Sequence, residues 1–201
     1  KQPIGVVAAI TPWNFPFLIA CWKVAPALAA GNSVVLKPAS LTPLTALSLG
    51  QLAQEAGLPD GVLQVLPGSG YEAGNALATH PLIRKIGFTG STEVGTKIMK
   101  LAADDIKRVS LELGGKSPNI VFADADWQRA ALESPMSVFA NTGQDCCARS
   151  RMFIEQSIFD DFVSQFVAAT EKLNIGNPLL DETQIGPMVS SAQRELSESF
   201  I

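Results

Sequence analysis

The sequence contains few of the residues that bind metal ions or form disulfide frameworks. Its 201 residues include one histidine, His80, and three cysteines, Cys21, Cys146 and Cys147. A zinc site draws three or four ligands mostly from Cys and His at turn-like spacings, and no such cluster occurs, so we expect no metal. An odd cysteine count with two adjacent residues does not form a disulfide framework. This usage favours a reducing, cytoplasmic location.

Charge is also scarce, since 17% of the residues are charged and the net charge is −4. Lys and Arg are scattered, which excludes the basic surface that a nucleic-acid phosphate backbone requires. No apolar run approaches the roughly 18 uninterrupted residues of a membrane span. Residues 18–21 look like a lipoprotein cleavage box, but Pro12, Pro16 and Lys23 interrupt the surrounding apolar stretch, so we interpret it as interior. We therefore expect neither a nucleic-acid nor a membrane partner.

Short β-branched apolar runs alternate with helical patterns through the first half of the chain. Apolar runs of this length, closed by Gly or Pro, are typical of strands buried on both faces. The predicted strands are 4–10, 33–37, 61–66, 85–88 and 108–113, and the predicted helices are 19–30, 43–56, 71–79 and 91–103, with Thr42 as a helix N-cap. Crossovers of this length join parallel strands. Residues 1–113 are therefore predicted to form a doubly wound, mostly parallel α/β sheet.

The pattern starts again after Gly114-Gly115, which we take as a domain junction. Strands are predicted at 119–122 and 150–155, and helices at 126–139 and 160–172. The fold class is α/β, in which a sheet of the kind that binds nucleotides is joined to part of a second α/β domain. We expect residues 1–113 to be a partial cofactor-binding domain and residues 114–201 a partial catalytic domain.

Two motifs place reactive side chains next to glycines. Cys146 and Cys147 follow Gly143, where the backbone can turn and expose a thiol, although a buried cysteine often serves as a small hydrophobic residue. Glu112 ends an apolar strand before a glycine pair. It is either solvated at the strand end or lies in a cleft, where desolvation would raise the pKa of its carboxyl and make it a general base.

Three further motifs have both a structural and a functional interpretation. Asn14, between two prolines, either caps the next helix or donates to a developing oxyanion. The turn at Gly90-Ser91 opens a helix and either caps it or binds a phosphate. Lys37 ends a strand at the edge where open α/β sheets bind ligands, and it is otherwise a solvated surface lysine.

Together these motifs resemble the NAD(P)-dependent aldehyde dehydrogenase family. The likeness runs from Pro3-Ile4-Gly5-Val6 to residues 185–187, which is essentially the whole chain. The family patterns Glu-Leu-Gly-Gly-Lys and Gly-Gln-x-Cys occur at 112–116 and 143–146, with Glu112 and Cys146 34 positions apart. The set is highly specific in combination.

The resemblance implies a role for each motif. Cys146 matches the nucleophile, Glu112 the general base and Asn14 the amide of the oxyanion hole, whereas Cys147 occupies a position that should not be essential. A thiohemiacetal would form on Cys146, lose hydride to the cofactor and leave a thioester that water hydrolyses to the acid. Relatives that pass the acyl group to coenzyme A tend to lack the glutamate, so an acid-forming enzyme is expected.

The resemblance also implies a cofactor site. Its expected residues are Lys37 at the adenosine ribose, Gly90 and Ser91 at the pyrophosphate, Val94 against the adenine, and Trp13, Ser40 and Leu113 at the cofactor. Many relatives that prefer NAD carry Glu where this chain has Ser40. A hydroxyl can donate to a 2′-phosphate and has no charge to repel it, so either NADP or NAD is expected, with a slight lean to NADP.

Members of the family are considerably longer, so we expect this chain to be the middle of a two-domain enzyme that is a homo-oligomer at full length. The substrate would be a small aldehyde, and a succinate-semialdehyde-type member is one option. Two other hypotheses stay open. One is an inactive fragment that binds a nucleotide or a partner, and the other is an esterase that needs no cofactor. Exposed apolar faces would make the isolated chain poorly soluble.

Overall fold

A computed structural model describes residues 2–201 of the chain. The chain divides into two compact units, of which the first ends at Leu113 and the second begins at Gly114. Each unit has its own hydrophobic core.

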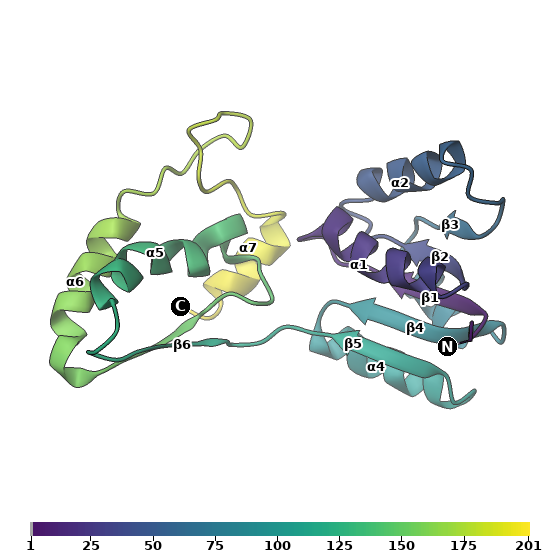
Figure 1. Ribbon diagram of the computed structural model, residues 1–201, viewed down its shortest axis with the longest axis horizontal. Helices are drawn as coiled ribbons and strands as arrows, with labels where there is room; N and C mark the ends of the chain where they lie inside the picture. The colour runs from purple at the N-terminus through teal and green to yellow at the C-terminus, as the bar shows by residue number, and fades with distance from the viewer. Residues whose placement is uncertain (1) are drawn as a thin grey trace. The chain divides into compact units, whose positions relative to one another are not determined.

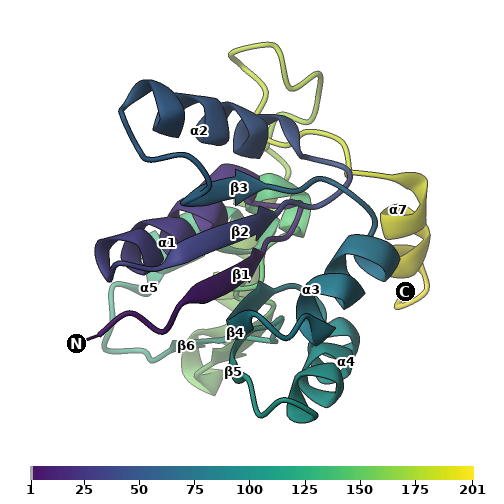
Figure 2. The same ribbon diagram turned by 90° about the vertical axis from the view of Figure 1, so that its right-hand side faces the viewer.

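The first unit is built on a five-stranded parallel sheet in the order β3-β2-β1-β4-β5. Its strands are β1 (Val6–Ile10), β2 (Ser33–Lys37), β3 (Leu63–Val65), β4 (Ile83–Thr89) and β5 (Arg108–Glu112). The chain runs outward from β1 to β3, then returns to the other side of β1 to add β4 and β5 (Figure 2). The order therefore reverses between β1 and β4, which confirms the predicted doubly wound α/β sheet.

Helices cover both faces of this sheet (Figure 1). They are α1 (Pro16–Ala29), α2 (Leu44–Glu55), α3 (Asn75–Thr79) and α4 (Thr92–Ala103). On one face Ala9 packs with Val24 of α1 and Ala46 of α2, and on the other Ile10 packs with Ile98 of α4. Successive residues of a strand point to opposite faces, so β1 supplies both cores. Across residues 2–201, no helix is long and apolar enough to span a membrane.

Two helix starts differ from the sequence prediction. Thr42 does not cap α2, because the helix begins one residue later with Pro43 at the N-cap and no side-chain cap. The Thr42 hydroxyl instead donates to the carbonyl of Trp13 at 3.4 Å. The helix predicted at 71–79 is divided into a π-helical turn at Gly70–Gly74 and the short α3.

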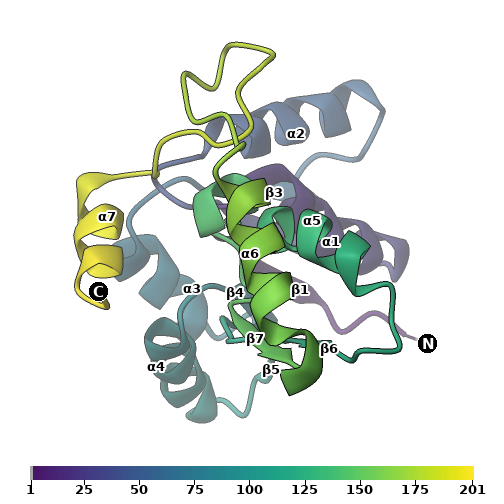
Figure 3. The same ribbon diagram turned by 90° about the vertical axis from the view of Figure 1, so that its left-hand side faces the viewer.

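The second unit pairs two parallel strands, β6 (Pro118–Val121) and β7 (Arg151–Ile154). The helices α5 (Trp127–Phe139) and α6 (Phe159–Thr170) pack on each other and on this pair (Figure 3). Val121, Ala131, Ile158 and Phe162 are the buried residues of the resulting core. Short 3-10 turns lie at Ala140–Gly143 and Gln156–Ile158, and α7 (Ser191–Glu198) lies in a polar stretch for which no helix was predicted.

Candidate active site

The register of the parallel sheet gathers the predicted cofactor residues at its C-terminal edge. Ile10 of β1 lies opposite Lys37 on one side and Phe88 on the other, and Thr89 lies opposite Glu112. The segments that carry Asn14, Ser40 and Ser91 leave these strand ends within a few residues. Ligands of open α/β sheets bind at this edge, outside the point where the strand order reverses.

One cavity at this edge brings Lys37 and Val94 together. It has a volume of about 310 Å³, and Ile10, Phe88 and Ile98 form part of its wall. The Lys37 side chain is buried and donates from Nζ to the carbonyl of Pro38 at 2.9 Å. Burial lowers the pKa of this ammonium below its usual value. A cavity with mainly apolar walls and one buried cation is the kind that accommodates a nucleoside.

Two residues of this cavity were not predicted from the sequence. Tyr71 and Lys97 both line it, and the Lys97 ammonium lies 5.5 Å from the centre of the Tyr71 ring. This separation is within the range of a cation–π interaction. No motif marks either residue, because Tyr71 lies in the π-helical turn and Lys97 on a regular face of α4.

Two buried hydroxyls at the same edge have no hydrogen-bond partner within residues 2–201. They are Oγ1 of Thr11, directly after β1, and Oγ1 of Thr89, the last residue of β4. A buried polar group without a partner costs about 1–3 kcal/mol, and a polar ligand that bonds to it removes this cost. The two hydroxyls therefore fit a nucleotide cofactor bound where the strand order reverses.

The turn from β4 to α4 requires a glycine and is closed by a serine cap. A Cβ on Gly90 would lie 2.5 Å from Cζ of Phe88, so a larger residue does not fit without a shift. The Gly90 N–H donates to the Glu112 carbonyl at 3.1 Å. Ser91 is the N-cap of α4, and its Oγ accepts from the Val94 N–H at 3.3 Å. The capping interpretation is therefore confirmed, while a phosphate role for this turn stays a prediction.

Trp13 and Asn14 lie half-buried in the segment between β1 and α1. The helix begins at Pro16 with Phe15 at the N-cap and no side-chain cap. Phe15, and not Asn14, is therefore the N-cap residue of this helix. Its amide is held in a segment that the Thr42 hydroxyl ties to the Trp13 carbonyl.

Glu112 is exposed and lines a different cavity, on the opposite face of the sheet from Lys37 and Val94. Val7 and Ala9 contribute to this cavity of about 330 Å³, whereas their neighbour Ile10 lines the other one. Leu113, the residue after β5, packs instead on the core that contains Ile10. The predicted base, Glu112, thus lies on the opposite face of the sheet from the predicted adenine site at Val94. This follows because successive side chains of a strand point to opposite faces of the sheet.

Lys23 faces Glu112 across this second cavity and was missed from the sequence. Burial lowers the pKa of Lys23, and the negative charge of Glu112 opposes that shift. Lys23 is the only charged residue of the otherwise apolar α1, which is the signal that could have identified it. Lys85 and Ser110 also line the cavity, and Lys85 Nζ donates to Ser110 Oγ at 2.6 Å.

In the second unit, the segment before Cys146 has an unusual backbone. Asn141 and Thr142 adopt positive φ values of 51° and 61° at the end of α5. This conformation is strained for a β-branched residue such as threonine. The Thr142 hydroxyl donates to the Gly186 carbonyl at 2.9 Å, and Oε1 of Gln144 accepts from the Val189 N–H at 3.0 Å. These bonds hold the segment in place.

Cys146 and Cys147 occupy the two central positions of a tight turn. The Ala148 N–H donates to the Asp145 carbonyl at 3.2 Å, and the Cys147 N–H donates to Oδ1 of Asp145 at 2.9 Å. Cys146 is half-buried, and its Sγ lies 3.7 Å from Sγ of the exposed Cys147. Burial raises the pKa of the Cys146 thiol to about 11, and the neighbouring Cys147 and Asp145 add to the shift.

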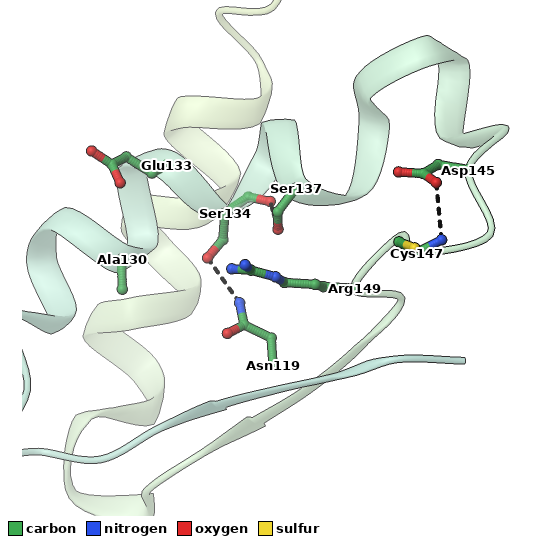
Figure 4. Close-up of a pocket in the computed structure, with 8 residues that line it drawn as sticks. All are labelled: Asn119, Ala130, Glu133, Ser134, Ser137, Asp145, Cys147 and Arg149. Atoms are coloured by element: carbon green, nitrogen blue, oxygen red, sulfur yellow. Dashed lines mark hydrogen bonds between the residues drawn. The ribbon is translucent and has the colours of Figure 1, made fainter. Parts of the chain in front are cut away.

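Cys147 also opens onto a cavity of about 540 Å³ within the second unit (Figure 4). The cavity has a largely polar wall, which includes Asp145 and Arg149. At the side away from the turn, Nδ2 of Asn119 donates to Oγ of Ser134 at 3.0 Å. The sequence motifs gave no indication of this cavity.

These features define an α/β protein with a doubly wound parallel sheet and a second unit that presents a cysteine turn. The sequence profile of the aldehyde dehydrogenase family matches residues 1–201, and the chain belongs to this family.

The chain is similar to aldehyde dehydrogenases of known sequence and structure. It is 53% identical over 195 residues to phenylacetaldehyde dehydrogenase of Pseudomonas fluorescens, covering 97% of the chain and 39% of that protein. Aldehyde dehydrogenase KauB of Pseudomonas aeruginosa superimposes with a TM-score of 0.97 at 50% identity, over 98% of this chain and 40% of KauB. A C291A mutant of AldC of Pseudomonas syringae, complexed with NAD+ and octanal, gives a TM-score of 0.97 at 44% identity, over 100% of this chain and 41% of AldC. The chain spans 40% or less of the curated relatives that it matches.

Proposed function

We propose that the protein containing this chain oxidises an aldehyde to a carboxylic acid with NAD or NADP, through a thioester on Cys146. The observation that carries this proposal is the turn at Asp145–Ala148, which presents the Cys146 thiol in a chain of the aldehyde dehydrogenase family. Family membership supports oxidoreductase chemistry on aldehydes. The role of each residue is our own assignment.

The cofactor would bind at the C-terminal edge of the parallel sheet. Lys37 and Val94, which line the same cavity, would hold the adenosine, and the turn at Gly90-Ser91 would hold the pyrophosphate. Trp13, Ser40 and Leu113 complete the proposed set. The buried hydroxyls of Thr11 and Thr89 would gain hydrogen-bond partners. When bound, the nicotinamide accepts a hydride from the substrate.

Cys146 would be the nucleophile of this reaction. Because the pKa of its thiol is about 11, the group is protonated at neutral pH, and attack on the carbonyl requires that this proton first be released to solvent water. Attack forms a C–S bond and places negative charge on the former carbonyl oxygen. The Asn14 amide and the Cys146 N–H would donate to this oxyanion. Loss of hydride then leaves a thioester on Cys146.

Glu112 would complete the turnover by removing a proton from water. The resulting hydroxide attacks the thioester, the C–S bond breaks, the acid leaves, and the Cys146 sulfur is reprotonated to the free thiol. Lys23 lines the same cavity as Glu112, and the negative charge of Glu112 opposes the lowering of the Lys23 pKa by burial. This order of events needs no metal ion.

The substrate would be a small aldehyde, and the full protein would be a cytoplasmic homo-oligomer. One relative is named phenylacetaldehyde dehydrogenase and the AldC structure is complexed with octanal, so an aromatic and an aliphatic aldehyde are suitable probes. A succinate-semialdehyde-type substrate is a third. These assignments rest on family likeness alone.

The test is to incubate the 201-residue chain with octanal or phenylacetaldehyde and NAD or NADP, and to follow the absorbance of the reduced cofactor. We expect reduction that Cys146→Ser abolishes and Cys147→Ser retains. No reduction together with calorimetric binding of the cofactor would instead support a second candidate, a nucleotide-binding fragment without turnover. The cavity that contains Lys37 and Val94 favours this candidate, since it lies wholly within the first unit.

A further inference from the structure

One carboxylate lies beside the thiol that we assign as the nucleophile. An oxygen of the Asp145 side chain lies within 4.8 Å of Sγ of Cys146 and of Sγ of Cys147. The turn fixes these residues together, since the carbonyl and Oδ1 of Asp145 accept from the N–H groups of Ala148 and Cys147. A molecule that reaches the Cys146 sulfur therefore comes close to a negative charge.

The charge of Asp145 is not neutralised by a cation within residues 2–201. No lysine or arginine of these residues forms an ion pair with its carboxylate. Besides burial and the neighbouring Cys147, the negative charge of Asp145 raises the pKa of Cys146, and no positive group lowers it. Asp145 is half-buried, so water and salt screen its charge less than at an exposed site.

Arg149 lines the same cavity as Asp145, but its side chain extends away from the turn. Its guanidinium lies toward Ser134, at the other side of the cavity (Figure 4). Glu133, the other acid of the cavity wall, is already paired with Arg129 at 2.7 Å. The side of the cavity at the cysteine turn therefore carries the negative charge of Asp145.

The Asp145 carboxylate also has room for a ligand. Its Oδ1 accepts one hydrogen bond, from the Cys147 N–H, whereas an ionised carboxylate offers about four acceptor positions. The side chain lines a cavity of about 540 Å³, which leaves space beside it for a group of the size of an ammonium. Hydrogen bonds between an ammonium and a carboxylate are among the stronger ones in proteins.

We propose that Asp145 is a specificity-determining residue that favours aldehydes with a positive charge a few carbons from the carbonyl, such as ω-aminoaldehydes. With the carbonyl carbon at the Cys146 sulfur, the ammonium of such a substrate lies beside the Asp145 carboxylate. An aldehyde with a carboxylate, such as succinate semialdehyde, meets a like charge there and is disfavoured. This inference rests on the proposed function in its use of Cys146 as the nucleophile.

The first experiment measures the charge preference without cofactor or turnover. It uses Cys147→Ser, in which Cys146 is the one thiol of the turn, and two methanethiosulfonate reagents, of which one carries a trimethylammonium group and the other a sulfonate. Each labelling rate is divided by the rate with a free thiol, and fragment masses locate the label on Cys146. Because the same thiolate attacks both reagents, the ratio does not depend on the pKa of Cys146. We expect the cationic reagent to react about tenfold faster.

Variants of Asp145 show whether its charge is the cause. Asp145→Asn should remove most of the preference, because its side-chain oxygen can still accept from the N–H of residue 147 while the charge is lost. Asp145→Glu should retain the preference, and Asp181→Asn, at an exposed position of the same unit, is the matched control. Higher salt should reduce the preference in the chain that keeps Asp145. Equal rates for the two reagents, or an unchanged ratio in Asp145→Asn, would overturn the proposal.

The second experiment compares aldehydes of the same shape and different charge. With cofactor present, 4-(trimethylammonio)butanal should give a kcat/KM about tenfold above that of its uncharged isostere, 5,5-dimethylhexanal, and Asp145→Asn should bring the two values together. A kcat/KM for succinate semialdehyde above that of the cationic aldehyde would overturn the proposal. No turnover of any aldehyde would contradict the proposed function instead, and the labelling ratio would still decide the charge preference at Cys146.

Discussion

The hydroxyl of Ser40 donates a hydrogen bond of 3.0 Å to the carbonyl of Gly68 at the exposed C-terminal edge of the sheet. The proton of this hydroxyl is thus engaged within the protein, and its oxygen remains an acceptor. The feature of Ser40 that matters for cofactor choice is therefore its lack of negative charge. A carboxylate at this position would repel a 2′-phosphate.

Substitution of Ser40 tests this account of cofactor choice. In Ser40→Glu we expect NADP to bind about tenfold more weakly relative to NAD, equal to about 1.4 kcal/mol, because two negative charges would meet. The measurement is calorimetric titration of the chain with each cofactor. Ser40→Gln, similar in size and uncharged, is the matched control. An unchanged ratio of the two dissociation constants in Ser40→Glu would contradict the assignment.

Two substitutions of Ser91 separate helix capping from phosphate binding. Ser91→Ala removes the acceptor of the Val94 N–H and should lower the free energy of unfolding by about 1 kcal/mol. Ser91→Asp keeps a cap and should restore that stability, but its charge should weaken cofactor binding at the same turn. Denaturant unfolding and cofactor titration of both variants give the comparison. Equal cofactor affinity in wild type and Ser91→Asp would argue against a pyrophosphate at this turn.

The pKa of Cys146 can be tested through its reaction with iodoacetamide. Only the thiolate reacts, so with a pKa of about 11 the rate should rise about tenfold per pH unit below that value. The negative charge of Asp145 disfavours the thiolate and contributes to the raised pKa. Asp145→Asn should therefore lower the pKa and speed alkylation at pH 8, by roughly threefold to tenfold. Fragment masses locate the label on Cys146, and Asp181→Asn, a surface change elsewhere in the unit, should have no effect.

Removal of the proposed base should affect only the second half of the reaction. With an activated ester as acyl donor, Glu112→Gln should still acylate Cys146 but release the acid about a hundredfold or more slowly. Rapid mixing would then show a burst of leaving group followed by a slower steady rate. Glu171→Gln, at the exposed end of α6, is the control and should match the wild type. Faster or unchanged release in Glu112→Gln would exclude Glu112 as the base.

The sheet of the first unit could be predicted because its strands are short, apolar and bounded by Gly or Pro. The run at 4–10 and the strand Ser33–Lys37 show this most clearly. Local sequence says less about where helices begin, since Thr42 bonds to the distant Trp13 carbonyl and does not cap α2. The helix α7 was missed because it has no buried residue, so no apolar pattern marks it.

The residues of the candidate site could be named from motifs, but their grouping could not. The packing of α4 on the sheet brings Val94 to the same cavity as Lys37, and alternation along β5 places Glu112 on the other face, where Lys23 also lies. Neither relationship is local in sequence. The left-handed backbone at Thr142 was equally unpredictable, because a β-branched residue adopts it only when its surroundings, here the bond to Gly186, compensate for the strain.

The central claim is that Cys146, and not Cys147, carries the acyl intermediate. The most direct measurement is to react the chain with 4-nitrophenyl acetate, stop the reaction in acid, and locate the acetyl group by fragment masses in wild type, Cys146→Ser and Cys147→Ser. We predict acetyl-Cys146 in wild type and in Cys147→Ser, and no thioester in Cys146→Ser. An acetyl group on Cys147 in the wild type would contradict the account. So would a thioester that is absent from Cys147→Ser and still present in Cys146→Ser.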